Sequence, residues 1–204
     1  MDARWADWAS RLNAIAQNGL TFSHDSFDIE RYTSVRNIAA EIISAHTGVE
    51  TTVVRDFFAG EEGYATPKLD VRGVVFRDGT LLFVKEPDDG LWSLPGGWAD
   101  VGESPGEGVV REVLEESGYA TRAVKLLALY DRNKHAHPPS PYHAYKLFIR
   151  CELLSQVPAG SAEAEARFFE EDAIPELSVA RVTAEQIARF FDHYRHPDWP
   201  ADFD

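Results

Sequence analysis

Cysteine, positive charge and long apolar runs are all scarce in this chain of 204 residues. Cys151 is the only cysteine, which excludes an internal disulfide and a zinc site built on thiolates. It lies in the strand-like run LFIRCEL. We expect a small buried side chain there, with a reactive thiol as the less favoured alternative.

Positive charge is in short supply, because 34 acidic residues face 20 lysines and arginines and give a formal net charge of −14. We therefore expect no nucleic-acid partner, since gripping a phosphate backbone needs a basic surface. Contact with an anionic membrane is disfavoured for the same reason. No stretch approaches the ~20 apolar residues that span a bilayer, and the opening MDARWADWASRLNAIAQ lacks the apolar core of a signal peptide. We expect a soluble, cytoplasmic protein.

Helical patterns fill the first third of the chain. Apolar residues recur at helical spacing over residues 4–17, and Gly19 is expected to end that helix. A second run covers residues 28–46, and a third, shorter one continues to about Ala59. Together they predict a helical N-terminal domain over residues 1–64, followed by the linker text GEEGYATPK.

The remainder of the chain, residues 65–204, reads as strands with two helices. LDVRGVVF and LLFVKE flank an Arg-Asp-Gly turn and predict a hairpin. Further strands are expected in RAVKLLALYD, AYKLFIRCEL and ARFF, and a last helix from about Thr183 to Tyr194. Strands interspersed with two helices predict an α/β/α sandwich.

The other helix of this domain lies in the most informative stretch, GWADVGESPGEGVVREVLEESGY, which covers residues 97–119. Ser104 provides an N-cap hydroxyl, Pro105 takes the first helical position, and Glu107 follows three residues after the cap. Gly118 supplies the stop. The stretch therefore predicts a loop, a short helix and a second loop.

Three glutamates, Glu112, Glu115 and Glu116, stand at i, i+3 and i+4 of this helix and so share one face. The opposite side is expected to hold Val110, Val113 and Leu114. Like charges at that spacing repel, and a bound cation would make the arrangement favourable. Hard oxygen ligands select Mg²⁺ or Mn²⁺. A solvated acidic helix face is the alternative that the spacing alone leaves open.

The flanking residues resolve this ambiguity through a resemblance. At fixed offsets the stretch carries Gly97, Glu103, Arg111, Glu112, Val113, Glu115, Glu116 and Gly118. In these positions the sequence resembles the Nudix hydrolase family, and Tyr119 is the one position where an aliphatic residue is commoner. The resemblance implies a Nudix α/β/α sandwich with a mixed sheet for residues 65–204, preceded by the small helical domain.

Members of this family hydrolyse a nucleoside diphosphate linked to another group X, with divalent metal ions that activate water and neutralise phosphate charge. The resemblance implies catalytic roles for Glu116 and for Arg111, which would orient the glutamates. The implied ligands of Mg²⁺ or Mn²⁺ are the Gly96 carbonyl, Glu112, Glu115, Glu116 and, as an accessory, Glu103.

A catalytic base in this family often comes from a glutamate on a loop beyond the motif. The text SAEAEARFF offers Glu165, the first candidate, and Glu163, the second. A solvated acidic loop is the alternative for each of them. A motif glutamate could also activate the water, because water held between metal ions needs little help.

Two candidate substrate-binding residues lie near the motif. Arg72 could reach a substrate phosphate, or it could form a surface or interdomain ion pair; Asp70 faces the same side of the strand. Trp98 could stack on a base or sugar, or it could pack onto the core.

Two further candidates, His137 and Tyr142, belong to the loop RNKHAHPPSPYH. The loop could line the substrate pocket or remain polar and exposed, and its prolines together with the lack of thiols disfavour a zinc site. Tyr145 is a rival to Tyr142 as a stacking partner.

Softer motifs cover nearly the whole chain. WADWASRLNAIAQNGLTF, DRNKHAHPPSPYHAYKLF, ELSVARVT and DWPADFD are similar to a bacterial Nudix subgroup that acts on CDP-choline or ADP-ribose. The similarity implies a homodimer in which the helical domain pairs the subunits. The first proline after the motif is Pro138, later than in many ADP-ribose hydrolases, and this weakens a pure ADP-ribose assignment.

We therefore expect a pyrophosphohydrolase that splits a small nucleotide conjugate into a nucleoside monophosphate and a phosphorylated X. A nucleotide-pool sanitiser acting on damaged nucleoside triphosphates is the enzymatic alternative. A non-catalytic metabolite sensor is the other, but the complete set of motif carboxylates and the acidic charge disfavour it.

Overall fold

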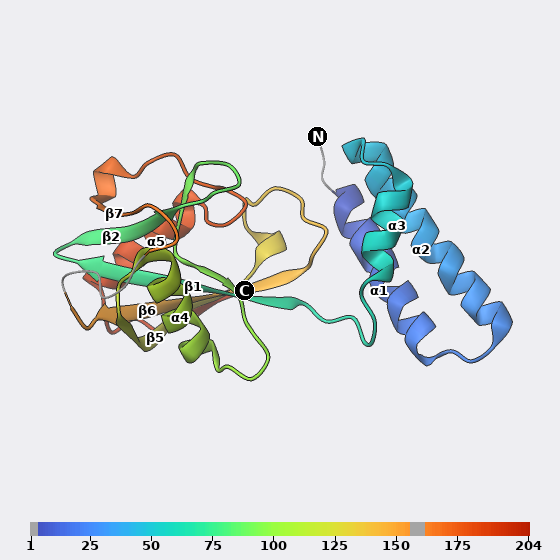
Figure 1. Cartoon of the computed structure of the whole chain (residues 1–204), viewed down its shortest axis with the longest axis horizontal. Helices are drawn as coiled ribbons and strands as arrows, with labels where there is room; N and C mark the ends of the chain where they lie inside the picture. The colour runs from blue at the N-terminus through green and yellow to red at the C-terminus, as the bar shows by residue number, and fades with distance from the viewer. Residues whose placement is uncertain (1–3, 156–161) are drawn as a thin grey trace. The chain divides into compact units, whose positions relative to one another are not determined.

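The computed structural model describes residues 4–155 and 162–204, which fall into two units (Figure 1). One unit comprises Met1–Pro67 with Pro139–His143, and the other comprises Lys68–Pro138 with Ala144–Asp204. The predicted division after residue 64 stays a prediction. Within the described residues, no helix combines the length and apolar character that a membrane span requires.

The first unit contains three helices, α1 (Arg4–Phe22), α2 (Ser26–Thr47) and α3 (Thr51–Ala59). All three were predicted, but the prediction that Gly19 ends the first helix is wrong, because α1 continues to Phe22. A Cβ at position 19 would overlap the ring of Tyr32 in α2. Close packing of the two helices therefore requires glycine there and outweighs its poor helix propensity.

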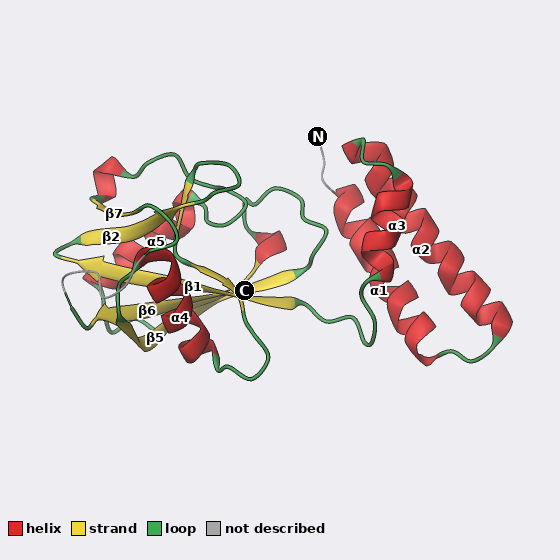
Figure 2. Cartoon of the chain, in the orientation of Figure 1, coloured by secondary structure: helices red, strands yellow, loops and turns green. Residues whose placement is uncertain are grey.

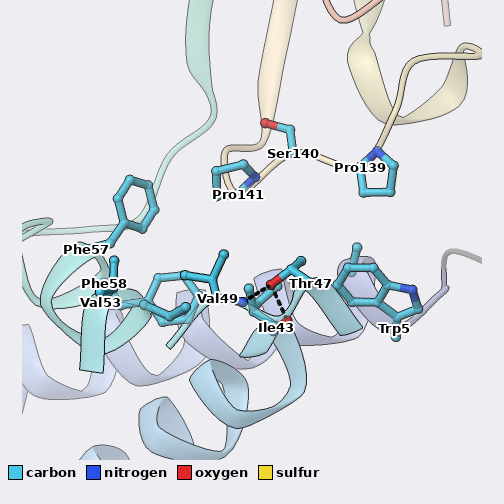
Figure 3. A pocket seen from close by; sticks show the side chains of 12 residues that line it. Trp5, Ile43, Thr47, Val49, Val53, Phe57, Phe58, Pro139, Ser140 and Pro141 are labelled. Carbon is cyan, nitrogen blue, oxygen red and sulfur yellow. Dashed lines mark hydrogen bonds between the residues drawn. The ribbon is translucent and has the colours of Figure 1, made fainter. Parts of the chain in front are cut away.

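An apolar cavity of about 300 Å³ lies in this first unit (Figure 3). Trp5, Ile43, Val53, Phe57 and Pro141 are among the residues that line it. The hydroxyl of Thr47 also faces it, but this group already donates a hydrogen bond to the Ile43 carbonyl at 2.8 Å. The lining of this cavity would therefore contact mainly apolar groups of any molecule that entered it.

The second unit is built on one mixed sheet of eight strands (Figure 2). Its order is β3-β2-β1-β6-β5-β8, with β4 paired to β1 and β7 paired to β2. The strands are β1 (Lys68–Arg77), β2 (Thr80–Lys85), β3 (Trp92–Ser93), β4 (Gly96–Trp98), β5 (Thr121–Asp131), β6 (Ala144–Leu153), β7 (Ala166–Phe169) and β8 (Asp202–Phe203). The β1·β6 and β5·β8 pairs are parallel and the others are antiparallel. The expected mixed sheet is confirmed.

Helices α4 (Pro105–Ser117) and α5 (Ala184–Arg195) cover opposite faces of this sheet. Alternate residues of β1 divide between them: Val71 and Val75 belong to the core under α4, whereas Val74 belongs to the core under α5. The predicted α/β/α sandwich is therefore confirmed. Short 3₁₀ turns, η1 (Arg132–Lys134) and η2 (Glu171–Ala173), complete the unit.

The predicted ends of α4 are confirmed in detail. Ser104 and Glu107 form a reciprocal capping box, and Gly118 ends the helix in the left-handed conformation with φ 74°. The predicted apolar face needs a correction, because Leu114 is 38% exposed and the buried positions are Val109 and Val113. A helix that lies against a sheet buries only a narrow stripe, and Leu114 falls at its edge.

Cys151 is buried in β6, as expected, and this burial raises the pKa of its thiol to about 12. The strand β8 was not predicted. Its two residues are too few to show a periodic pattern, and it is held by the Asp202 carboxylate, which accepts hydrogen bonds from Arg189 at 2.6 and 2.8 Å. The tail of the chain thereby becomes an edge strand beside β5.

Close contact between α4 and β1 gives a first prediction. A Cβ at Gly73 would overlap Cγ2 of Val113, whereas one at Gly106 would lie 3.7 Å from the Ala123 Cβ, an ordinary contact. Gly73→Ala should lower the free energy of unfolding by about 1–3 kcal/mol through overpacking. Gly106→Ala should leave it unchanged or raise it by up to ~1 kcal/mol. Urea unfolding measures both, and equal midpoints for the two variants would contradict the packing argument.

Candidate active site

Arg111 of α4 lies at the centre of four carboxylates. Its guanidinium donates hydrogen bonds to Glu103 at 3.1 Å, to Glu112 at 3.0 Å, to Glu115 at 2.9 Å and to Asp100 at 3.2 Å. The hydrogen bonds that Arg111 donates to Glu103 and Glu115 hold its pKa above the usual range. One cation thus organises the acidic groups of the motif loop and of the helix.

Glu116 has a different environment from the carboxylates around Arg111. It accepts a hydrogen bond from the backbone N–H of Gly96 at 2.8 Å. Burial raises the pKa of Glu116 to about 7, a shift opposed by the Gly96 N–H and by the charge of Arg72, and reinforced by Glu86 and Glu112. Burial also raises the pKa of Glu112. A nearby positive charge would therefore stabilise the ionised forms of Glu112 and Glu116.

Glycines bring the strand β4 within reach of these glutamates. Gly96 has φ 142°, and a Cβ there would overlap the carbonyl oxygen of Val71. A Cβ at Gly97 would lie 3.2 Å from the Glu112 carboxylate oxygens. The pair of glycines in the sequence therefore serves the close approach of β1, β4 and α4.

The loop with the two candidate bases docks on the end of α4. The backbone N–H groups of Glu163 and Ala164 donate to the carbonyls of Glu115 and Glu116 at 2.9 and 3.2 Å. The side chain of Glu165 pairs with Arg167 at 2.5 Å and lies 3.7 Å from the Lys85 ammonium. The loop is thus tied to the helix of the motif, although Glu165 itself is engaged with two cations.

Arg72 lies in a buried charge network rather than on the surface. It donates to the Asp70 carboxylate at 2.7 Å and to the Leu94 carbonyl at 3.1 Å, and it lies 3.8 Å from Glu86. Lys146 of β6 also pairs with Asp70. Arg72 therefore forms an ion pair, but not the surface or interdomain pair that was the alternative: the pair is buried inside the second unit, and only 6% of Arg72 remains accessible.

Three members of this network were missed in the sequence: Glu86, Lys146 and Arg132. Each reads locally as a surface charge at the end of a strand, and only the tertiary structure buries it. Glu86 accepts a hydrogen bond from Ser93 and pairs with Arg181 at 2.8 Å. The one sequence signal that could have indicated their burial is a charged residue just after an otherwise apolar strand, as Glu86 is in LLFVKE.

The other two aromatic candidates for substrate contact, Trp98 and Tyr142, belong to different units. Trp98 stands on β4 directly after the two glycines and is 47% exposed, so it does not plug the core. Tyr142 belongs to the first unit, where its ring packs against Phe57 with centroids 5.0 Å apart.

His137 is a fixed neutral side chain. Its Nδ1 lies 2.7 Å from the Val179 carbonyl and its Nε2 lies 3.2 Å from the Gln186 amide nitrogen. A carbonyl only accepts and an amide nitrogen only donates, so the ring proton is on Nδ1. Burial lowers the pKa of His137 to about 4. These contacts fasten the loop to the start of α5.

The donor set of Glu112, Glu115, Glu116 and the Gly96 carbonyl consists of oxygen atoms and suits a hard divalent cation. The raised pKa values of Glu112 and Glu116 fit such an ion, because a cation would offset the cost of ionising these buried groups. In the part of the chain that the structure describes, no three side chains converge as a ready metal site. Glu112 and Glu115 turn toward Arg111, and Glu116 turns toward Gly96.

Comparisons with known proteins match both parts of the chain. Residues 66–191 match the NUDIX domain, and residues 3–58 match a domain described as "UDP-X-like, N-terminal oligomerisation domain". A Bacillus subtilis (strain 168) protein named "Putative ADP-ribose pyrophosphatase YjhB" is 47% identical over 205 residues, which cover 100% of this chain and 99% of that protein.

Two solved structures are also similar. The crystal structure of an ADP-ribose pyrophosphatase from Streptococcus suis 89-1591 matches with a TM-score of 0.61 and 40% identity, over 68% of this chain and 100% of that chain. The crystal structure of a UDP-X diphosphatase matches with a TM-score of 0.62 and 30% identity, over 99% of this chain and 98% of that chain.

The raised pKa of Glu116, about 7 in the folded protein, predicts a pH effect on stability. The unfolded carboxyl ionises near pH 4.3, so its stabilising contribution is complete below that pH and is lost as pH rises toward 7 and above. Without metal, Glu116→Gln should match the wild type near pH 4.5 and be more stable by about 1–3 kcal/mol at pH 8.

Urea unfolding in EDTA at several pH values measures this difference. Glu163→Gln, which neutralises an exposed carboxylate, is the matched control and should show no such gain. Parallel pH profiles for Glu116→Gln and the wild type would contradict the burial argument.

Proposed function

Because the chain belongs to the NUDIX family, we propose that it hydrolyses the diphosphate of a nucleoside diphosphate linked to X, giving a nucleoside monophosphate and a phosphorylated X. The NUDIX domain and the ADP-ribose pyrophosphatase relatives indicate a hydrolase that acts on pyrophosphate bonds. The observation that carries the proposal is the set of motif glutamates held around Arg111 with Glu116 beside them.

ADP-ribose is the first substrate to test, because the full-length relative at 47% identity is named for it. CDP-choline and UDP-linked conjugates follow, the latter because a UDP-X diphosphatase matches over 99% of this chain. The first proline after the motif is Pro138, later than in many ADP-ribose hydrolases, and this remains the sequence feature that argues against a strict ADP-ribose preference.

Nudix hydrolases generally need divalent metal ions, and Mg²⁺ or Mn²⁺ is our proposal for this chain. Its ligands would be Glu112, Glu115, Glu116 and the Gly96 carbonyl, with Glu103 as an accessory. When bound, the ion supplies a water of lowered pKa and neutralises phosphate charge.

Positioning is the proposed role of two arginines. Arg111 holds Glu112 and Glu115 by charge-assisted hydrogen bonds, so their repulsion does not spread them. Arg72 acts on Glu116 through its charge, which favours the ionised form of that carboxyl group. Because Arg72 is buried, we assign it this role in place of direct phosphate contact.

Glu165 remains the first candidate for the base, and Glu163 the second. The two backbone hydrogen bonds from their loop to α4 support a position near the glutamates. Glu165 would have to leave its pairs with Arg167 and Lys85 in order to take a proton. Trp98, exposed beside the motif glycines, is the proposed stacking surface for the nucleotide, whereas the contacts of His137 and Tyr142 favour structural roles.

The proposal predicts metal-dependent turnover of ADP-ribose, CDP-choline or a UDP-sugar, with added phosphatase releasing orthophosphate from the monoester products. Glu116→Gln should lower kcat by several orders of magnitude while the fold is kept, and Glu165→Gln should cost about 10²- to 10⁴-fold as a general base. Steady-state assays with Mg²⁺ and with Mn²⁺ measure these effects.

Near wild-type turnover in Glu116→Gln would overturn the site assignment, and an effect of Glu163→Gln larger than that of Glu165→Gln would move the base to Glu163. Preference for nucleoside triphosphates would indicate the sanitiser. Binding without any turnover would indicate the sensor.

We also infer that the chain forms a homodimer through its helical unit. Residues 3–58 match a domain described as an oligomerisation domain. On α1, Trp8, Ile15 and Phe22 repeat every seven residues and are 53%, 55% and 64% exposed, so they form an apolar stripe on one face. Such a stripe is costly in water and is typical of a surface that another helix covers.

The stripe predicts that Ile15→Glu converts the dimer to a monomer, because the charge would be buried at the interface. Val101→Glu is the control, since Val101 is fully exposed in the motif loop of the other unit, and it should leave the dimer intact. Sedimentation velocity separates the two states, and circular dichroism checks the fold. A wild-type protein that sediments as a monomer would overturn the inference.

A further inference from the structure

A cluster of buried charges lies on the α5 face of the sheet, where the proposed catalysis makes no direct use of it. Asp70 and Arg72 of β1 alternate with Val71, which packs under α4, so their side chains take the opposite face. Lys146 is the register partner of Asp70 on β6 and pairs with its carboxylate. Tyr130 stands opposite Lys146 on β5, and Arg132 follows two residues later.

Arg132 is the unusual member of this cluster. Only 7% of the residue is accessible, yet no hydrogen bond or ion pair of its guanidinium is found among residues 4–155 and 162–204. A buried guanidinium without an acceptor is costly, and buried charges in proteins are normally paired. Its guanidinium nitrogens are not fully sealed from solvent, so the group keeps a narrow access to the outside.

The cluster also carries more positive than negative charge. Arg72 and Lys146 both pair with Asp70, whose charge also acts on Arg132, and the only other carboxylate in contact with Arg72 among the described ion pairs, Glu86 at 3.8 Å, is paired with Arg181 as well. Burial lowers the pKa of Lys146 to about 8, a shift that Asp70 opposes and that the charges of Arg72 and Arg132 reinforce. A buried surplus of cations in a chain of net charge −14 marks a local site for an anion.

This cluster borders the proposed catalytic glutamates through β4. Arg72 is the register partner of Gly96, whose N–H binds Glu116, and Asp70 is the register partner of Trp98. Arg132 follows β5, which β6 separates from β1, so the cluster extends from Arg132 across neighbouring strands of the same sheet towards β4.

The segment that carries Arg132 is fixed from outside by the tail strand. The Asp204 side chain accepts a hydrogen bond from the Asp131 N–H at 2.6 Å and lies 3.3 Å from His135, and Asp202 accepts one from the Tyr130 hydroxyl at 3.2 Å. His137 ties the next residues to Val179 and Gln186. Arg132 is thus held between two anchored points, as a preorganised binding group requires.

We propose that Arg132 and Lys146 form a binding site for a phosphate monoester. The guanidinium supplies a fork of donors that matches a phosphate, and the ammonium supplies a second positive charge. This inference rests on the proposed function, because that reaction yields two phosphate monoesters, the nucleoside monophosphate and the phosphorylated X. Either of them carries the chemistry that the site recognises.

The test is metal-free binding, measured by calorimetry in EDTA with inorganic phosphate, AMP and ribose 5-phosphate as probes. Arg132→Gln should weaken the binding of the preferred probe at least about 10-fold, and Arg132→Lys should weaken it less, because the charge is kept but the fork is lost. Arg122→Gln is the matched control: it removes one positive charge from an exposed β5 side chain that pairs with Glu152 at 2.8 Å. It should bind within twofold of the wild type.

Tighter binding of AMP than of ribose 5-phosphate would assign the site to the nucleotide half of the substrate, and the reverse would assign it to the X half. An unchanged dissociation constant in Arg132→Gln, or a wild type that binds none of the probes at tens of millimolar, would overturn the proposal. If Arg132→Gln does not fold, Arg132→Lys decides, because loss of the fork alone should weaken binding several-fold.

Turnover plays no part in this measurement. The site can therefore fail while the pyrophosphohydrolase activity is confirmed, and phosphate binding can succeed while that activity is absent.

Discussion

Four carboxylates converge on the guanidinium of Arg111, and the arrangement of the candidate active site depends on this interaction. Asp100 and Glu103 come from the motif loop, whereas Glu112 and Glu115 come from α4. Without the arginine, glutamates one turn apart would repel each other and the loop would have no fixed distance from the helix. With it, each carboxylate keeps lone pairs for a second cation while its position is set. Arg111 thus offsets the repulsion among the four carboxylates and also fixes their positions.

The glutamates keep their positions relative to β4 only if α4 packs at a fixed, short distance from the sheet. Small residues allow this close approach. Gly73 leaves room for Val113, and Gly96 leaves room for the Val71 carbonyl. The Gly96 N–H then reaches Glu116, and the carbonyls of Glu115 and Glu116 accept hydrogen bonds from the loop of Glu163. Backbone contacts therefore connect two strands, the helix and the loop of the candidate bases. Function in this unit rests on close backbone packing as much as on the acidic side chains.

The parts that could be predicted from the sequence are those encoded locally. The capping box of Ser104, the stop at Gly118 and the hairpin turn are short-range patterns, and the structure has all three. Gly19 was misjudged because a glycine required by the packing of α1 on α2 looks the same as a helix end. Leu114 was misjudged because the width of a buried stripe depends on the sheet beneath it. Glu86, Lys146 and Arg132 were missed, since charges at strand ends become buried only through contacts between distant segments.

The two faces of the sheet carry buried charge of opposite net sign. This difference gives a physical reason why a diphosphate together with a metal ion would bind at the edge of the sheet. On the α4 face, burial makes the ionised forms of Glu112 and Glu116 costly, so this side attracts cations. On the α5 face, Arg72, Arg132 and Lys146 outnumber the carboxylates of Asp70 and Glu86, so we expect this side to attract anions. Arg72 couples the two, because its charge acts on both Glu116 and Lys146. A phosphorylated ligand with its counter-cation offsets both costs at once, whereas either partner alone offsets only one. Binding of metal and binding of phosphate should therefore reinforce each other in this fold.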